Sequence, residues 1–192
     1  ANQKLYKFVR KLPIDVQLAG PFRVIDRIPL FAYHRVYVTK NLAHPFRAGY
    51  YAEAERRIEV VYDALYSSDL AAIVASLEKE HVDYFAFDPA VFRALDRTLF
   101  NPVRTNIARI YNANKATGFA LERVPRDCIV YQDRTTRIVS VEKLRKALAR
   151  GEVSARAPAP SSTEAAPFIG PQRAPRKTDV PPMARPRTPK IP

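Results

Sequence analysis

The chain has 192 residues, 47% of them hydrophobic, and a formal net charge of +13 at pH 7. This length and hydrophobic content suit one sizeable core and leave little room for a second domain. The lone cysteine, Cys128, excludes an intramolecular disulfide and a cysteine-built metal site, and no hydrophobic run is long enough to cross a bilayer.

The positive charge is shared by two parts of the chain. Residues 1–150 contain 25 Lys and Arg against 16 Asp and Glu, and residues 151–192 contain 7 against 3. We therefore interpret the basicity as a property of the whole chain. Such a charge favours an anionic partner, which could be nucleic acid, a lipid headgroup surface or an acidic protein. A soluble protein that is simply rich in arginine is the plainer alternative.

The first forty residues predict a helix and two strands. Apolar residues at helical spacing in "NQKLYKFVRKLP" predict a helix that Pro13 ends. "IDVQLAG" predicts a short strand, and "HRVYVTKN" predicts a second one in which Val36 and Val38 face one way and Tyr37 the other. A connection broken by Pro21 and Pro29 joins the two strands.

The middle of the chain predicts two helices and a buried strand. From Tyr50 on, one helical stripe is formed by Ala54, Ile58, Val61 and Leu65. Ser68 is expected to cap the next helix, whose stripe is Leu70, Ile73, Val74 and Leu77. "DYFAFD" then predicts a strand, so this unit is half of a βαβ motif.

The closing part of residues 1–150 mixes helices and strands. "PAVFRALDRTLF" predicts a helix, and Asn101 and Pro102 are expected to begin a further helix. "FALERV", "CIVYQD" and "RIVSV" predict three short strands, the last two joined at "DRTT". Cys128 lies in the apolar run "CIVY", which indicates a core residue. Ser140 is expected to cap the last helix, "VEKLRKALAR".

These elements predict an α/β fold: a three-layer domain over residues 1–150 with a mixed sheet of about five short strands flanked by helices. Residues 151–192 hold 10 of the 17 prolines and one aromatic residue, Phe168, which predicts a disordered Pro/Arg-rich tail. Such a tail could bind the groove or acidic surface of a partner. Its candidate contact residues are Phe168, Arg173, Arg176, Lys177, Arg185 and Arg187. A solubilising tail is the plainer alternative.

Catalytic and cofactor signatures are missing from the sequence. Its five glycines are too scattered for a dinucleotide fingerprint or a P-loop, and no GxSxG motif occurs. The histidines His34, His44 and His81 are too far apart for a metal motif, which indicates structural or surface roles. We therefore expect no cofactor and no metal, and the sequence favours a non-catalytic role.

The stretch "DRIPLFAYHRVYVTKNLAHPF", residues 26–46, gathers an acid, several cations and four aromatic residues between prolines. Ligand sites in open α/β sheets favour the region beyond the carboxyl ends of the strands. Asp26, Arg35, His44 and, from the following helix, Arg57 are therefore candidate ligand or partner contacts. The alternative is that Asp26 only closes the loop by pairing with Arg27 or Arg35.

The order of motifs resembles a known class of membrane protein. "LYKFVRKLPIDVQLAG", residues 26–46, "GYYAEAERRIEVVYDALYSSDLAAI" and "HVDYFAFDP" resemble the C-terminal soluble region of polytopic bacterial membrane proteins, GT-C glycosyltransferase-like or uncharacterised, over about residues 4–141. The resemblance implies an extracytoplasmic, periplasmic α/β domain. Enzymes of that type use an acidic residue in an early extracytoplasmic loop and a lipid-linked sugar donor. This chain has neither that loop nor membrane helices, so no catalytic residue carries over.

We therefore predict a non-catalytic binding or scaffolding domain associated with a membrane protein assembly. Its partner would be an integral membrane protein or a multi-subunit membrane complex, with an anionic lipid surface as a further contact. One alternative is an accessory module of a membrane glycosyltransferase-like enzyme that acts on lipid-linked sugars. Another is a basic RNA- or ribosome-associated protein, because several arginines gather on the helices and strands after residue 89.

Overall fold

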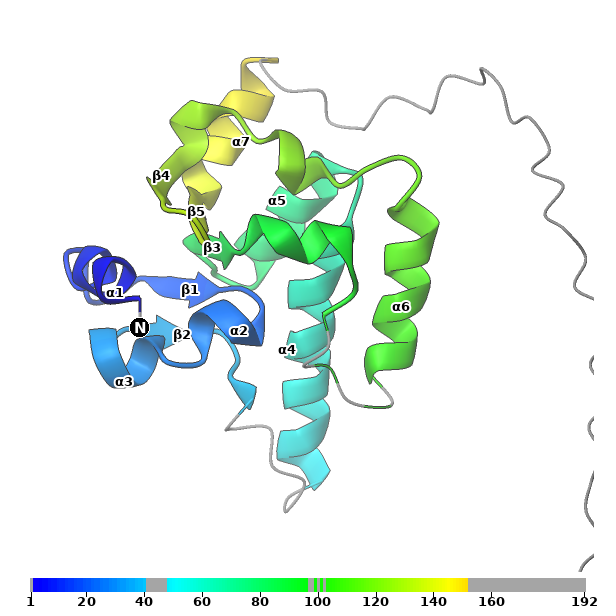
Figure 1. The fold of residues 1–192 in the computed structure, drawn as a ribbon, viewed down its shortest axis with the longest axis horizontal. Helices are drawn as coiled ribbons and strands as arrows, with labels where there is room; N and C mark the ends of the chain where they lie inside the picture. The colour runs from blue at the N-terminus through cyan, green and yellow to red at the C-terminus, as the bar shows by residue number, and fades with distance from the viewer. Residues whose placement is uncertain (1, 41–47, 97–98, 100, 102, 152–192) are drawn as a thin grey trace, which may run out of the picture. The chain divides into compact units, whose positions relative to one another are not determined.

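The computed structural model describes residues 2–40, 48–96, 99, 101 and 103–151. Within these residues, helices cover both faces of a five-stranded mixed sheet (Figure 1), which confirms the predicted fold class. The sheet has the order β2-β1-β3-β5-β4 and consists of β1 (Gln17–Ala19), β2 (Arg35–Val36), β3 (Tyr84–Phe87), β4 (Ile129–Gln132) and β5 (Arg137–Ser140). The predicted tail, with its candidate contacts, lies outside the described residues.

The sheet has a parallel half and an antiparallel half. β1 runs parallel to both β2 and β3, with Leu18 opposite Val36 on one side and Tyr84 on the other. β5 pairs antiparallel with β3 and with β4, so the predicted "DRTT" hairpin closes the sheet. The connections from β1 to β2 and from β2 to β3 use different helices on different faces of the sheet.

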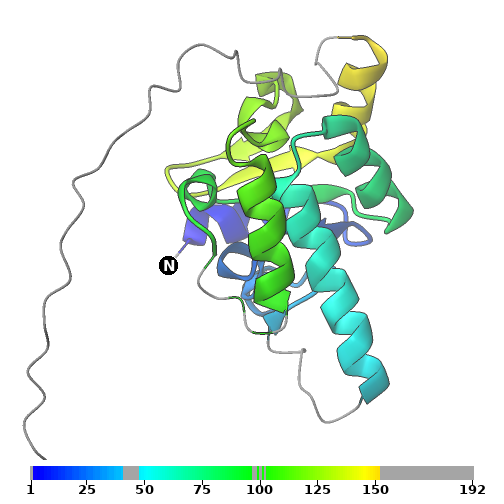
Figure 2. The same ribbon diagram turned by 90° about the vertical axis from the view of Figure 1, so that its right-hand side faces the viewer.

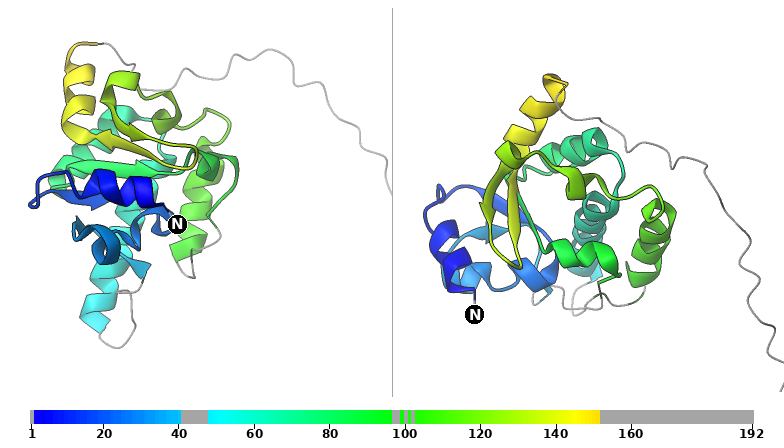
Figure 3. Two further views of the ribbon diagram at one scale, coloured as in Figure 1. Left: turned by 60° about the vertical axis from the view of Figure 1, so that its left-hand side comes forward. Right: turned by 45° about the horizontal axis from the view of Figure 1, so that its top comes forward.

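One face of the sheet carries a small core. It is covered by α1 (Gln3–Val9) and α3 (Ile28–Ala32), which contact each other, while α2 (Phe22–Ile25) follows β1 (Figure 3). Every second residue of a strand faces this side of the sheet. The core here consists of Leu5, Val9, Leu18, Val24, Ile25, Ile28, Ala32, Ala86 and Ile138. The short helices limit how much apolar surface this face can bury.

The other face carries a much larger core. It is covered by α4 (Ala48–Tyr66), α5 (Leu70–Lys79), α6 (Val103–Asn114) and α7 (Val141–Ala149), and α4 and α6 lie side by side (Figure 2). Both predicted stripes, on α4 and on α5, are buried. Phe85, Phe87 and Val139 face this side, one position out of phase with Ala86 and Ile138. The period of two along each strand therefore separates the two cores.

The connection between β1 and β2 is more regular than the sequence predicted. It contains the helices α2 and α3, and each has a proline at its start: Pro21 caps α2, and Pro29 lies in the first turn of α3. Proline is tolerated there because the first amides of a helix have no intrahelical acceptor. The two prolines therefore begin helices in this connection.

Three local predictions were wrong. Asp69, not Ser68, caps α5, accepting from the amides of Ala71 and Ala72 at 2.9 and 3.0 Å. "FALERV" forms a 3₁₀ turn, Ala120–Arg123, because its apolar residues pack near the C-terminal ends of α4 and α6. The helix predicted from Pro89 is a 3₁₀ turn that ends at Arg93, although Phe92 is buried as expected.

The predicted second strand is shorter than its sequence suggests. β2 covers only Arg35–Val36, and beyond it Tyr37 and Val38 both join the larger core. The strand alternation ends because the chain turns toward α4 and α5: the Tyr37 carbonyl accepts from Arg57 on α4, and the Tyr37 hydroxyl donates to Glu80 at the end of α5. Ser140 caps α7 as predicted, accepting from the amide of Lys143 at 3.4 Å, and Cys128 is buried.

Candidate functional site

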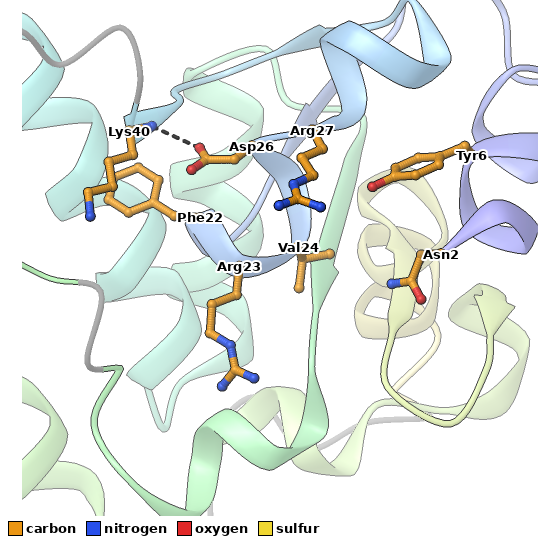
Figure 4. Close-up of a pocket in the computed structure, with 8 residues that line it drawn as sticks. All are labelled: Asn2, Tyr6, Phe22, Arg23, Val24, Asp26, Arg27 and Lys40. Carbon is orange, nitrogen blue, oxygen red and sulfur yellow. Dashed lines mark hydrogen bonds between the residues drawn. The ribbon is translucent and has the colours of Figure 1, made fainter.

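Asp26 lines a surface cavity of about 470 Å³ in the segments that follow β1 and β2 (Figure 4). The walls come from the start of α1, from α2 and the turn after it, and from the residues after β2: Asn2, Tyr6, Phe22, Arg23, Val24, Asp26, Arg27 and Lys40. The apolar Phe22 and Val24 of this lining are buried. The cavity therefore lies beyond the carboxyl ends of β1 and β2, the region that ligand sites in open α/β sheets favour.

The polar groups of this cavity point toward open space. In Figure 4 the guanidinium of Arg27 and the hydroxyl of Tyr6 point toward each other, with the amide of Asn2 beside them. Within the described residues, no side chain or backbone carbonyl accepts from Arg23 or Arg27, and the Tyr6 hydroxyl and the Asn2 amide make no hydrogen bond. The cavity therefore presents four donor groups available to a ligand.

Asp26 has a structural partner of its own. Its carboxylate accepts a hydrogen bond from the backbone amide of Lys40 at 2.8 Å, which fixes the end of the β2 segment against α2. This differs from the expected loop closure by Arg27 or Arg35, because the carboxylate faces Lys40 in Figure 4. Burial raises the pKa of the half-buried Asp26, and the Lys40 amide and charge oppose that rise.

A second hollow, of about 550 Å³, adjoins the first one. It lies between α1 and α3, is lined by Gln3, Tyr6, Lys7, Arg10, Arg27 and Phe31, and shares Tyr6 and Arg27 with the Asp26 cavity. The rings of Tyr6 and Phe31 stack with centroids 5.2 Å apart. Arg10 ties the two helices together by donating to the Phe31 carbonyl at 2.9 and 2.6 Å. This hollow is aromatic on its wall and cationic at its rim.

The helix α3 and its C-cap residue expose large apolar side chains near cations of α1. Leu30, Phe31 and Tyr33 are 68%, 41% and 73% exposed. We call the α1–α3 surface the set Lys7, Arg10, Arg27, Leu30, Phe31 and Tyr33. Leu30, Phe31 and Tyr33 therefore form an exposed apolar patch beside cations.

Tyr33 adds a conformational observation. It ends α3 with φ at 60°, in the left-handed region that normally favours glycine or asparagine. A tyrosine there costs stability, and the Arg10 guanidinium lies over its exposed ring, 5.7 Å from the ring centroid. Strained residues of this kind cluster at functional sites.

The charge is unevenly distributed along the folded part of the chain. Residues 1–40 contain eight Lys and Arg against two Asp and Glu, residues 48–88 contain three against nine, and residues 89–150 contain thirteen against five. The excess of positive charge therefore lies both in the segments that build the α1–α3 face and in those that follow β3, while the segment from α4 to β3 is net acidic.

Arg35 lies at the other end of β2 from the Asp26 cavity. It pairs in register with Gln17 at the start of β1 and lines a separate hollow of about 700 Å³ with acidic neighbours that include Asp15, Glu78 and Asp83. Several of these acids are engaged: Asp83 accepts from the Gln17 amide at 2.7 Å, and Glu78 pairs with Arg145 at 3.1 Å. Arg35 and Asp26 therefore do not form one site.

Arg57 belongs to an ionic network that joins α4, α5 and the segment after β2. It donates to Glu53 at 2.7 Å and to the Tyr37 carbonyl at 3.1 Å, while Arg56 joins Glu53 to Glu80. Hydrogen bonds from Arg56 and Arg57 lower the pKa of Glu53 to about 2, and those from Arg56 and Tyr37 lower the pKa of Glu80 to about 2. Burial and the Glu80 hydrogen bond raise the pKa of Tyr37. The geometry gives Arg57 a structural position.

His34 is buried and structural, as the sequence indicated. Its Nδ1 lies 2.9 Å from the Ala32 carbonyl, and its Nε2 lies 3.2 Å from the carbonyls of Leu12 and Pro13. The ring thereby holds the turn after α1 against the end of α3. His44 lies outside the described residues.

Two further searches covered the described part of the chain. No group of three or more His, Cys, Asp and Glu side chains there could hold a metal ion. No helix there is both long enough and apolar enough to pass through a bilayer.

The sequence did not single out Tyr6, Arg23, Arg27 or the exposed residues of α3. The signal that could have found the exposed residues is "IPLFAY", because an apolar run on so short a helix cannot be buried on one side. Arg23 lies on α2, and Arg27 directly precedes α3. The sequence did not predict these two short helices, so it gave no reason to place the two arginines together.

The fold and the site define a three-layer α/β domain with one basic, aromatic face. No protein-family model matches the chain, and no curated protein matches it. Among solved structures, it is similar to the C-terminal globular domain of an oligosaccharyltransferase from Archaeoglobus fulgidus, with 10% identity, a TM-score of 0.42, and 72% of this chain and 94% of that chain covered. A likeness this weak transfers no residue role, activity or partner.

Proposed function

We propose that this is a non-catalytic binding domain of a membrane protein assembly, and that its α1–α3 surface is the side that meets the membrane. The observation that carries the proposal is the exposure of Leu30, Phe31 and Tyr33 within a segment, residues 1–40, that contains eight Lys and Arg against two Asp and Glu. Aromatic and aliphatic side chains bind the interfacial zone of a bilayer, while Lys and Arg bind anionic headgroups.

The magnitudes support a reversible association. Each Lys or Arg near an anionic membrane contributes about 1 kcal/mol, and burial of one exposed leucine contributes about 1.5 to 3 kcal/mol. The α1–α3 surface offers three cations and three apolar side chains, so no membrane-spanning segment is needed for binding. A partner protein embedded in the membrane would then add specificity.

The bacterial and periplasmic setting suggested by the motif order belongs to this proposal, and so does a partner-binding role for residues 151–192. The tail would extend over a partner while the domain meets the membrane surface. Deletion of residues 151–192 is expected to weaken capture of the protein partner and to leave vesicle binding by the domain unchanged. Unchanged capture would remove the tail from the proposal.

Vesicle co-sedimentation tests the membrane contact. We expect the full chain to bind vesicles containing phosphatidylglycerol more tightly than vesicles of phosphatidylcholine alone. The double substitution Leu30→Ser with Tyr33→Ser should weaken binding about tenfold or more, because two interfacial anchors are lost. Tyr50→Ser is the matched control, since Tyr50 is 47% exposed but lies on α4. Equal binding by all three proteins would contradict the proposal.

A mild-detergent pull-down from native cells tests the assembly. Recovery of an integral membrane protein that is lost with the Leu30→Ser, Tyr33→Ser variant supports the proposal. Recovery of ribosomal proteins and RNA, with an affinity that falls steeply with salt, would instead favour the nucleic-acid alternative and contradict it.

A further inference from the structure

We propose that the Asp26 cavity binds a phosphate group, with Arg27 as its central ligand and Arg23, Tyr6 and Asn2 as supporting donors. The cavity is lined by these four residues, and their polar groups have no acceptor among the described residues. Donors without acceptors around a shared opening suit an anion. Guanidinium groups favour phosphate because they can bind two of its oxygens at once.

The arrangement in Figure 4 supports Arg27 as the centre. Its guanidinium lies between the turn after α2 and the Tyr6 hydroxyl, and the Asn2 amide completes that side from the start of α1. The side chains of Phe22 and Val24 also line the cavity and give a ligand no competing acceptor. The one carboxylate in the cavity, Asp26, faces Lys40, whose amide it already binds at 2.8 Å.

The position of the cavity indicates where the phosphate could come from. Tyr6 and Arg27 also line the hollow between α1 and α3, which carries the stacked Tyr6 and Phe31 rings. A phosphate monoester could thus sit in the cavity while the rest of its molecule lies along the aromatic wall. The phosphate could belong to a lipid headgroup or to a soluble compound, and the inference rests on the proposed function only in the lipid case.

Two soluble probes and one lipid probe separate these sources. Calorimetric titration with inorganic phosphate and with glycerol 1-phosphate measures the cavity in the absence of membranes. Co-sedimentation with phosphatidylcholine vesicles containing phosphatidic acid measures the same chemistry on a bilayer. Chemical-shift changes at Tyr6 and Arg27 in an NMR titration of the full chain locate the bound ion in the soluble arms.

Four single substitutions test the assignment. Arg27→Gln should lower affinity about tenfold or more, and Tyr6→Phe about threefold to fivefold, because each removes a donor and keeps the surrounding packing. Asp26→Asn should raise affinity about threefold, because it removes a negative charge beside the ligand while its amide oxygen can still accept from Lys40. Arg104→Gln, on the distant α6, is the charge-matched control and should change affinity by less than about twofold.

Each outcome decides between these readings of the cavity. Saturable binding of soluble phosphate that is lost in Arg27→Gln supports the site with a soluble ligand. Binding only to phosphatidic acid vesicles, with a larger loss in Arg27→Gln than in Arg104→Gln, supports it with a lipid ligand. Equal losses in the two arginine variants, or no saturable binding in any arm, would overturn it. If soluble phosphate binds but Leu30→Ser with Tyr33→Ser leaves vesicle binding intact, the phosphate site stands and the proposed membrane contact fails.

Discussion

The two faces of the sheet follow different rules of construction. The α4–α7 face buries long apolar stripes against Phe85, Phe87 and Val139. The α1–α3 face rests on a small core of short helices and leaves Leu30 and Tyr33 in solvent among cations. The comparison indicates that one face buries most of the apolar surface, and that the other leaves apolar and cationic groups exposed, as the proposed membrane contact requires.

The sharpest test of this comparison concerns Gly20, where β1 leads into α2. Its φ is +157°, and an added Cβ would overlap the carbonyl oxygen of Ala86 on β3. Gly20→Ala should therefore force the strands apart and lower the free energy of unfolding by about 4 kcal/mol or more, measured by urea denaturation. Gly49→Ala on α4 is the control. Its Cβ meets nothing, and alanine should stabilise that helix by about 0.5 to 1 kcal/mol. Similar losses in both variants would refute the close approach.

A pair of leucine substitutions measures the difference between the faces directly. Leu65 on α4 is fully buried, so Leu65→Ala should cost about 3 kcal/mol through lost burial and a residual cavity. Leu30→Ala on α3 should change the free energy of unfolding by less than about 0.5 kcal/mol, because Leu30 is already in water. Comparable costs at the two positions would show that the α1–α3 surface is part of the core.

Tyr33 separates stability from binding at one position. Tyr33→Gly relieves the left-handed backbone at the end of α3 and should raise the free energy of unfolding by up to about 1 kcal/mol. The same change removes an exposed aromatic ring and should weaken vesicle binding severalfold. Thermal unfolding and co-sedimentation of the same preparation measure the two effects. A variant that is less stable, or that binds vesicles as well as the wild type, would contradict this separation.

The smallest expected effect is the acid sensitivity of the ionic network on the α4–α7 side. The pKa of Glu80 is lowered to about 2 by hydrogen bonds from Arg56 and Tyr37. A carboxyl group with a lowered pKa stabilises the fold above its unfolded pKa, near about 4.3, and this contribution is lost as pH falls toward about 2. Glu53 follows the same sign, but its exposed ion pairs are screened by solvent.

Glu80→Gln should therefore flatten the fall in melting temperature between about pH 5 and about pH 2. Glu55→Gln, on the same helix as Glu53 but outside the network, should leave that pH dependence unchanged. If Glu80→Gln melts with the wild-type pH profile, the network contributes nothing to folding stability.

Much of the fold could be predicted because its signals are local. The stripes on α4 and α5, the strand before Pro89 and the hairpin at "DRTT" each depend on residues close in the chain. The errors fall where distant partners decide the structure. Tyr37 departs from the strand alternation because its hydroxyl donates to Glu80. "FALERV" folds as a turn because its apolar residues pack near the C-terminal ends of α4 and α6.

The candidate site could be predicted only in part. Asp26 was chosen for its place after a strand, and the structure puts it in a cavity there. Arg35 and Arg57 share its stretch of sequence or the next helix, yet one lies at the opposite end of β2 and the other in an ionic network. Proximity in sequence gave the wrong neighbours for Asp26, because Tyr6 and Asn2 reach the cavity from α1.

By itself, the sequence determined the class of fold, the division into helices and strands, and the basic character of the chain, since each depends on composition or on periodicity along the chain. Only the tertiary structure decided which cations gather on one face, which apolar side chains stay in water, and which donors surround a common cavity. These properties depend on the packing of α1 and α3 over β1 and β2, and that packing joins residues that no local pattern connects.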